Sequence, residues 1–362
     1  MKLYDDEVFE LQKIGSSDSG FSESEIREIN KFYSKLKKDA SHQTKLDKCY
    51  ICDKKCDSFC NSHSVPNFVL SNIAVDGKVY RTNKVLEISS PQELFGLKQV
   101  GTFRMICRDC DSVLFQNYEN EMALQEVIDK SLLSEIALKN YLNEIYNKKT
   151  SSVMFDKMSD FSPMAASQVY PAELDVVEAE SNAQYALNSI KGKSKGYYLF
   201  YSIKLNYTVP IAFQNDITLV SDLEGMMVNN VYNFDKDYEQ KNIHVCIFPL
   251  KDSTTILMFV KEGDKRYSKF RKQFKKLNFD EQLEVINYMI FLYSDEVYIS
   301  PKIDTEIFNN DNLKEVCSLT SSYMIHTNKP YAERNPIKIT INEYDLSKRL
   351  KIPNLLLKEF SI

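Results

Sequence analysis

The sequence has 362 residues, of which 43% are hydrophobic and 12% aromatic, so it can form one large domain or two smaller ones. A formal net charge of −5 excludes a protein that coats nucleic acid non-specifically, and any nucleic-acid site must be a local basic surface. The first residues lack an apolar signal segment, and no apolar run reaches the length of a membrane span. We therefore expect a cytoplasmic protein without a membrane partner.

The first predicted element is an amphipathic helix in an N-terminal segment, residues 1–48. Ser22 and Glu25 have the spacing of a capping box. The apolar residues that follow recur at helical spacing; they are Ile26, Ile29, Phe32, Tyr33 and Leu36.

Two cysteine pairs with the spacing Cys-x-x-Cys follow in the next region, residues 49–149. They are Cys49 with Cys52 and Cys107 with Cys110. Each pair closes a turn that directs two thiolates at one ion, and four thiolates complete a tetrahedral site for Zn²⁺. The cytosol keeps thiols reduced, so clustered cysteines there favour a metal over disulfides. We predict a structural zinc site at these four residues.

Alternatives remain open for the cysteine-rich region. Cys56 and Cys60 could join the first pair in a local four-thiolate site, although the second pair would then have no role. His63 could replace one thiolate in a Cys₃His site. Cys56 and Cys60 could also be ordinary buried thiols, and the paired spacing could be a coincidence in a cysteine-rich stretch.

The residues between the pairs read Ser62-His63-Ser-Val-Pro66, and Asp111 directly follows the second pair. This order of motifs resembles the treble-clef HNH (His-Me finger) endonucleases, in many of which two cysteine pairs staple a ββα motif around a catalytic His. The resemblance covers about residues 49–119. It implies that fold, with His63 as the general base that takes a proton from water, and with Mg²⁺ or Mn²⁺ as the catalytic ion.

The motif departs from the family at the catalytic metal. Many members carry Asp or a second His directly before the catalytic His, where this chain has Ser62, and the family's final His is replaced by Asp111. Asp111 is therefore the candidate oxygen ligand. Further candidates for a ligand or an orienting group are Asn61, Asn117 and Glu119.

The leading functional expectation is a metal-dependent endonuclease that cleaves DNA or RNA, with a role in phage defence by analogy alone. The alternatives are a non-catalytic zinc module that binds nucleic acid or a protein partner, and a zinc site that is purely structural. The chain lacks Gly-rich phosphate loops, which argues against nucleotide-driven enzymes.

Beyond the second pair, apolar residues keep a helical period from Met122 to about Tyr146. Residues 150–195 are rich in small and charged residues and contain two prolines. We expect an inter-domain connector there, with one short helix near Ala183.

Residues 196–362 change to the patterning of an α+β domain with a mainly antiparallel sheet. Strands are predicted at 197–204, 217–220, 243–248, 254–260 and 337–341. A hairpin turn is expected at 249–253, and helices at 266–277 and 280–293. Asn278 and Glu281 are spaced to cap the second of these helices.

The helix at 266–277 is the main basic cluster of the chain. Its apolar face is expected at Tyr267, Phe270, Phe274 and Leu277. The cations that lie largely elsewhere are Arg266, Lys269, Lys272 and Lys275. They predict either a phosphate-contacting surface or the solvated side of a docked helix. The C-terminal domain would then select a substrate or bind a protein partner; the oligomeric state is not indicated.

Overall fold

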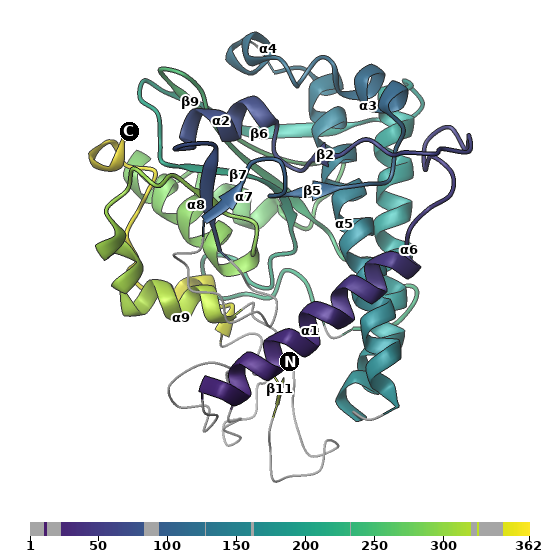
Figure 1. The fold of residues 1–362 in the computed structure, drawn as a ribbon. Coiled ribbons are helices and arrows are strands. Elements are labelled where there is room, and N and C mark those ends of the chain that lie inside the picture. Colours follow the sequence, from purple (N-terminus) through teal and green to yellow (C-terminus); the bar gives the residue numbers. More distant parts are fainter. Residues whose placement is uncertain are drawn as a thin grey trace.

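The structure is a computed structural model that describes residues 11–12, 23–82, 94–126, 128–160, 163–231, 233–319, 324–325 and 343–362. Helices and antiparallel strands are mixed along the chain, which confirms the α+β class (Figure 1). The α-helices in these ranges are α1 (Glu23–Gln43), α2 (Asn67–Ile73), α3 (Arg108–Phe115), α4 (Glu121–Gln125), α5 (Lys130–Ser159), α6 (Pro163–Ile190), α7 (Ser268–Phe274), α8 (Phe279–Tyr293) and α9 (Asp311–Leu319). The strands are β1 (Leu11–Gln12), β2 (Ser62–His63), β3 (Lys78–Arg81), β4 (Leu94–Gly96), β5 (Thr102–Phe103), β6 (Tyr197–Leu205), β7 (Ile211–Ile217), β8 (Ile243–Pro249), β9 (Thr254–Lys261), β10 (Tyr298–Ile299) and β11 (Met324–Ile325).

A seven-stranded antiparallel sheet forms the centre of the molecule, in the order β4-β3-β10-β7-β8-β9-β6. Along β8, Ile243 and Val245 face one hydrophobic core while Cys246 and Phe248 face the other. Because both faces of the sheet are buried, its central strands are almost continuously apolar. The turn between β8 and β9 closes as expected.

The sheet joins regions that lie far apart in the sequence. Tyr298 and Ile299 of β10 pair with Arg81 and Tyr80 on one side and with β7 on the other. The sheet therefore contains strands from both sides of the expected boundary at residue 196, because β3 and β4 come from the cysteine-containing region.

Helices cover both faces of the sheet (Figure 1). Residues of α7, α8 and α9 share one core with the sheet, and residues of α2, α3, α5 and α6 share the other. In the described parts of the chain no helix is long and apolar enough to cross a membrane.

The expectation of a connector at 150–195 was wrong. This stretch continues α5 to Ser159 and then forms the 28-residue helix α6, which packs along α5. Ala179, Ala183 and Ala186 are buried at this contact, so the small residues taken for a linker are the close-packing side of a helix.

Other local predictions met mixed outcomes. The capping box of Asn278 and Glu281 is confirmed at the start of α8. The strand at 217–220 was wrong, since β7 ends at Ile217, and the helix from Met122 is interrupted between α4 and α5. Ser22 and the strand at 337–341 lie outside the described residues.

Candidate metal centre and the face around His63

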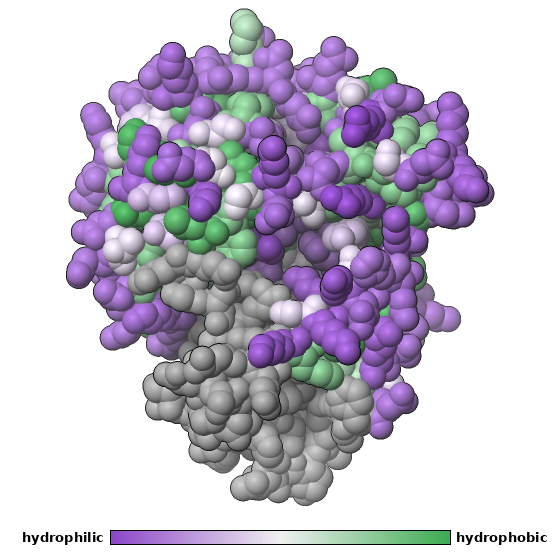
Figure 2. All heavy atoms as spheres, viewed as in Figure 1, coloured by the Kyte–Doolittle hydropathy of each residue, from purple (hydrophilic) through white to green (hydrophobic). Residues whose placement is uncertain are grey.

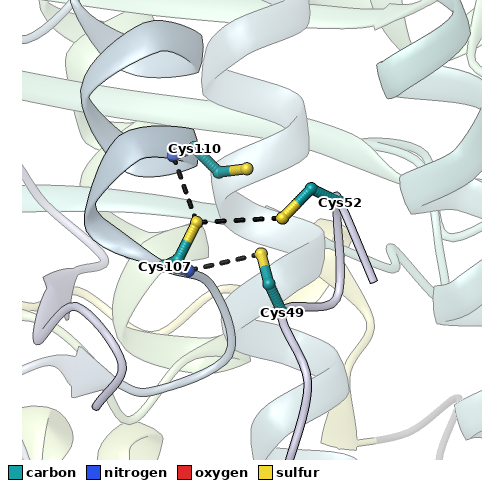
Figure 3. Close-up of side chains that lie close together, drawn as sticks. All are labelled: Cys49, Cys52, Cys107 and Cys110. Atoms are coloured by element: carbon teal, nitrogen blue, oxygen red, sulfur yellow. Dashed lines mark hydrogen bonds between the residues drawn. The ribbon is translucent and has the colours of Figure 1, made fainter. Parts of the chain in front are cut away.

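We call residues 49–82 and 94–119, the described part of the region around the two cysteine pairs, the module. Four sulfur atoms converge at one point near its surface (Figure 3). The Sγ atoms of Cys49, Cys52, Cys107 and Cys110 all lie within 4.8 Å of one another. The distance between the sulfurs of Cys52 and Cys107 is 3.9 Å. Zinc–sulfur bonds of about 2.3 Å in a tetrahedron require sulfur–sulfur distances of about 3.8 Å, so the arrangement fits Zn²⁺.

A tight turn presents the first pair of cysteines. The backbone N–H of Cys49 donates to the carbonyl of Lys54, and the N–H of Asp53 donates to the carbonyl of Cys49, both at 2.9 Å. Asp53 has a φ of 56°, a left-handed conformation that Asp adopts more readily than most residues. This turn places both thiols of the pair on the same side.

The second pair lies at the start of α3, where Cys107 is the N-cap residue. Its sulfur accepts a hydrogen bond from the N–H of Cys110 at 3.5 Å, and its own N–H donates to Cys49 Sγ at 3.3 Å. The partial positive charge at the start of a helix favours thiolates at these positions.

The electrostatics of the sulfur group are those of a site built for a cation. Burial raises the pKa of the Cys49 thiol, but the N–H groups of Cys107 and Cys52 point at it, and the pKa falls to about 7. Burial and the neighbouring sulfurs raise the pKa of Cys110. Four thiols this close ionise together only around a cation, and Zn²⁺ held by four thiolates has no open position for chemistry.

Cys56 and Cys60 lie outside this group. The Cys56 thiol contacts the carbonyl of Lys54 at 3.3 Å, and the Cys60 thiol contacts Asp111 Oδ2 at 3.4 Å. His63 is also outside the group, and its Nε2 faces the Leu97 carbonyl. The described residues thus bring together the four cysteines of the two pairs rather than a local four-thiolate or Cys₃His set.

His63 lies on β2 opposite Thr102 of β5, and its ring is held by the backbone. Its Nε2 is 2.8 Å from the carbonyl oxygen of Leu97. A carbonyl only accepts hydrogen bonds, so Nε2 carries a proton, and in the neutral ring Nδ1 keeps a lone pair. This is the tautomer that a general base needs.

The two sides of the β2–β5 pair differ in burial. Ser62 and Phe103 form one cross-strand pair, and both are at most 2% exposed. The neighbouring pair, His63 and Thr102, is partly exposed on the opposite side, as the alternation of strand side chains requires.

Asn61 and Arg104 extend the partly exposed side of the β2–β5 pair. Arg104 Nε donates to Asn61 Oδ1 at 3.2 Å, and Asn61 Nδ2 donates to the carbonyl of Lys98 at 3.1 Å. We call Asn61, His63, Thr102, Arg104 and Lys98 the His63 face. The Arg104 and Lys98 side chains are exposed, and Figure 2 shows mainly hydrophilic side chains on the side of the molecule that carries this pair.

Asp111 lies on the buried side of the β2–β5 strand pair, next to Ser62. Its Oδ1 accepts a hydrogen bond from Ser62 Oγ at 2.6 Å and from Lys139 Nζ at 3.0 Å. Burial acts to raise the pKa of Asp111, but the Lys139 ammonium and the Ser62 hydroxyl outweigh it and hold the pKa below its usual range. Asp111 is thus bound into the protein rather than presented to solvent beside the imidazole.

The other candidate ligands also have partners inside the protein. Glu119 Oε1 accepts from Lys139 Nζ at 2.9 Å, and Asn117 Nδ2 donates to Glu135 Oε1 at 2.8 Å. Sequence reasoning missed Lys139, which lies on the same side of α5 as Leu132, Ile136 and Asn143. A lysine in line with the apolar residues of a helix was the available signal.

The basic helix α7 lies on the other side of the sheet from α3 and α5. Its apolar face is docked, with Tyr267, Phe270 and Phe274 fully buried. Arg266 Nη1 contacts Asn229 Oδ1 and the Glu239 carbonyl, both at 2.8 Å.

Lys269 is paired with Asp222 and Glu224, whereas Lys272 and Lys275 are exposed. Two of the four cations proposed for nucleic acid are therefore used within the protein, and the phosphate-contacting role of α7 stays a prediction.

The fold and the site together define an α+β protein with a four-cysteine group able to hold a metal ion. Comparison with family models, curated proteins and solved structures finds no match for this chain.

Proposed function

We propose that this chain binds nucleic acid at the His63 face and cleaves a phosphodiester bond there, with His63 as the general base. The observation that carries the proposal is the hydrogen bond between His63 Nε2 and the Leu97 carbonyl, which leaves Nδ1 as a base on a partly exposed side chain. Zinc at the four cysteines would hold the module that carries this histidine.

Nδ1 of His63 takes a proton from the nucleophile, which is a water molecule or a ribose 2′-hydroxyl group. The oxygen attacks phosphorus, the bond to the leaving oxygen breaks, and solvent returns a proton to that oxygen. Arg104 directly follows β5, two residues after Thr102, the cross-strand partner of His63, and its side chain is exposed, so its guanidinium can contact a phosphate of the bound strand.

The expected catalytic Mg²⁺ or Mn²⁺ does not fit at Asp111. Mg²⁺ requires about six oxygen ligands at about 2 Å. Asp111 Oδ1 already accepts two hydrogen bonds, one of them from the Lys139 ammonium, and Asp111 Oδ2 is 3.4 Å from the Cys60 thiol. No step of the proposed reaction is therefore assigned to an ion at this carboxylate.

The test is a cleavage assay on plasmid, single-stranded DNA and RNA, with wild-type protein and the His63→Ala variant. We expect cleavage by the wild type and a loss of at least about 100-fold in the variant, the usual contribution of a positioned base. His42→Ala is the matched control because His42 is exposed on α1, and it should retain wild-type activity.

Each reaction is run with Mg²⁺, with Mn²⁺ and with EDTA, and zinc content is measured afterwards. Absence of cleavage on every substrate by folded, zinc-loaded protein would reject the nuclease proposal.

A second candidate is a non-catalytic module that binds nucleic acid or a protein partner. It is favoured by the engagement of Asp111 and Glu119 with Lys139, which removes the carboxylates available for a catalytic ion. Binding of a labelled oligonucleotide that is unchanged in His63→Ala but weakened in Arg104→Ala, without any cleavage, would support this candidate.

A further inference from the structure

A buried lysine, Lys139, lies between two acidic residues of the module, Asp111 and Glu119. The Lys139 side chain is 0% exposed, whereas the side chains of Asp111 and Glu119 are 14% and 35% exposed. Nζ lies 3.0 Å from Asp111 Oδ1 and 2.9 Å from Glu119 Oε1. A lysine is rarely buried to this extent unless its charge is paired.

The Lys139 ammonium is surrounded by groups that stabilise a positive charge. An ammonium has three N–H donors, and two of them are used by the two carboxylates. On a further side lies the Phe115 ring, whose centroid is 3.9 Å from Nζ, a cation–π distance. The cation is thereby enclosed by α3, by the segment that follows it and by α5.

The same position is where the sequence led us to expect a divalent ion. A Mg²⁺ or Mn²⁺ ion bound to Asp111 Oδ1 at about 2 Å would lie within a few ångströms of the Lys139 ammonium. Two cations at that separation in a poorly hydrated site repel each other strongly. Occupation by the ammonium and by a divalent ion therefore exclude each other.

We propose that Lys139 is a built-in cation that fills the metal position between Asp111 and Glu119, so that the module takes no divalent ion there while this lysine is present. This inference concerns ion binding and holds whether or not the chain cleaves nucleic acid. The Lys139 ammonium is fully buried, so it cannot itself touch a substrate.

The proposal predicts that removal of the lysine opens a cation site. In Lys139→Ala the two carboxylates lose their counter-ion, and the truncated side chain leaves space for a hydrated ion. We expect this variant to be less stable than the wild type and to gain Mn²⁺ binding, measured by electron paramagnetic resonance of free Mn²⁺ on zinc-loaded protein. Saturating Mn²⁺ should also raise its melting temperature by about 2 °C or more, whereas the wild-type value should not change.

Two control variants separate this site from other cation sites. Asp111→Asn combined with Lys139→Ala removes one carboxylate as well, and it should bind no Mn²⁺ and show no thermal shift. Lys149→Ala removes another lysine of α5, one that pairs with Glu180 and is 28% exposed, and it should behave like the wild type.

The wild type alone also tests the proposal if Lys139→Ala fails to fold. Mn²⁺ binding by wild-type protein that disappears in Asp111→Asn would overturn it, as would a folded Lys139→Ala protein that binds no Mn²⁺. Cleavage that requires Mg²⁺ and Asp111 would overturn this inference while supporting a nuclease. Cleavage that is lost in His63→Ala but is indifferent to divalent ions would agree with both proposals.

Discussion

His244 illustrates how a single polar residue is accommodated inside this protein. Its ring is 0% exposed and stacks on Phe259 with a centroid distance of 4.5 Å. Nδ1 accepts from Asn140 Nδ2 at 3.0 Å, which leaves the proton on Nε2, 3.1 Å from the Tyr141 hydroxyl. Burial, with a smaller effect from Lys261, lowers the pKa of His244 to about 3, so the ring is neutral at every physiological pH.

The lowered pKa of His244 predicts a pH-dependent stability. Between about pH 6.5 and pH 3 the unfolded chain binds a proton that the folded chain does not, so this residue destabilises the fold as the pH falls. Well above pH 6.5 His244 is neutral in both the folded and the unfolded chain and imposes no such cost. On going from pH 7.5 to pH 5.5, His244 lowers the free energy of unfolding by about 1.4 kcal/mol. Urea unfolding of wild type and His244→Gln at both pH values measures it.

The comparison with the variant is needed because Glu178 contributes in the opposite direction. Burial raises its pKa to about 7, so protonation of the folded protein at lower pH is favourable there. An equal pH dependence of the unfolding free energy in wild type and His244→Gln would contradict the assignment.

At the level of elements, a glycine turn fits the β2–β5 pair against the central sheet. Gly101 precedes β5 with a φ of +58°, and its carbonyl accepts from the N–H of Ser64 at 2.7 Å. A Cβ at this position would collide with the hydroxyl groups of Tyr298 and Ser64. Since Tyr298 belongs to β10, this glycine lets the module and the sheet approach closely.

We expect Gly101→Ala to destabilise the protein by about 2 kcal/mol or more, from the left-handed backbone and the steric overlap together. Gly192→Ala is the matched control. Its φ is +68°, but an added Cβ meets nothing within 4 Å, so only the backbone cost of about 1 kcal/mol should remain. Denaturant unfolding compares the two, and an equal loss in both variants would exclude the proposed collision.

Some helices and strands differ from the sequence predictions because contacts with distant segments determine which residues they bury. β7 contains Gln214, whose Nε2 donates to Asn140 Oδ1 of α5 at 2.9 Å. A strand pattern does not reveal such a residue, because its hydrogen-bond partner lies on a helix 74 residues away. Similarly, the alanines of α6 have the composition of a linker, and only their packing against α5 shows that they belong to a buried helix face.

At the scale of the whole molecule, the cysteine module and the C-terminal region are joined through one sheet and one core. β10 pairs with β3 on one side and β7 on the other. Val65, Leu70 and Ile73 of the module share a core with Phe248 and Phe259 of the sheet. Unfolding of the module would therefore expose apolar surface of the sheet as well.

Loss of zinc is accordingly expected to affect the entire protein. Cys107→Ser should bind less zinc than the single ion per chain expected of the wild type, measured by elemental analysis. Its melting temperature in calorimetry should fall, with one cooperative transition rather than two. Cys56→Ser is the control because Cys56 lies outside the four-sulfur group, and it should keep its zinc. Two separate transitions in Cys107→Ser would show that the module unfolds on its own.

The sequence alone indicated the four cysteines, the mixed α+β class, the β8–β9 hairpin and the cap of α8. Each depends on residues at short spacing, or on residue types with few alternative roles. Only the tertiary structure decided how β3 and β4 join the central sheet and which partners Asp111 receives. A lysine 28 residues beyond Asp111 became its counter-ion because α5 packs beneath the β2–β5 pair, and no local pattern encodes that contact. Burial and charge pairing between distant segments arise only when the chain packs. They are the reason that the Mg²⁺ or Mn²⁺ expected at Asp111 does not fit there.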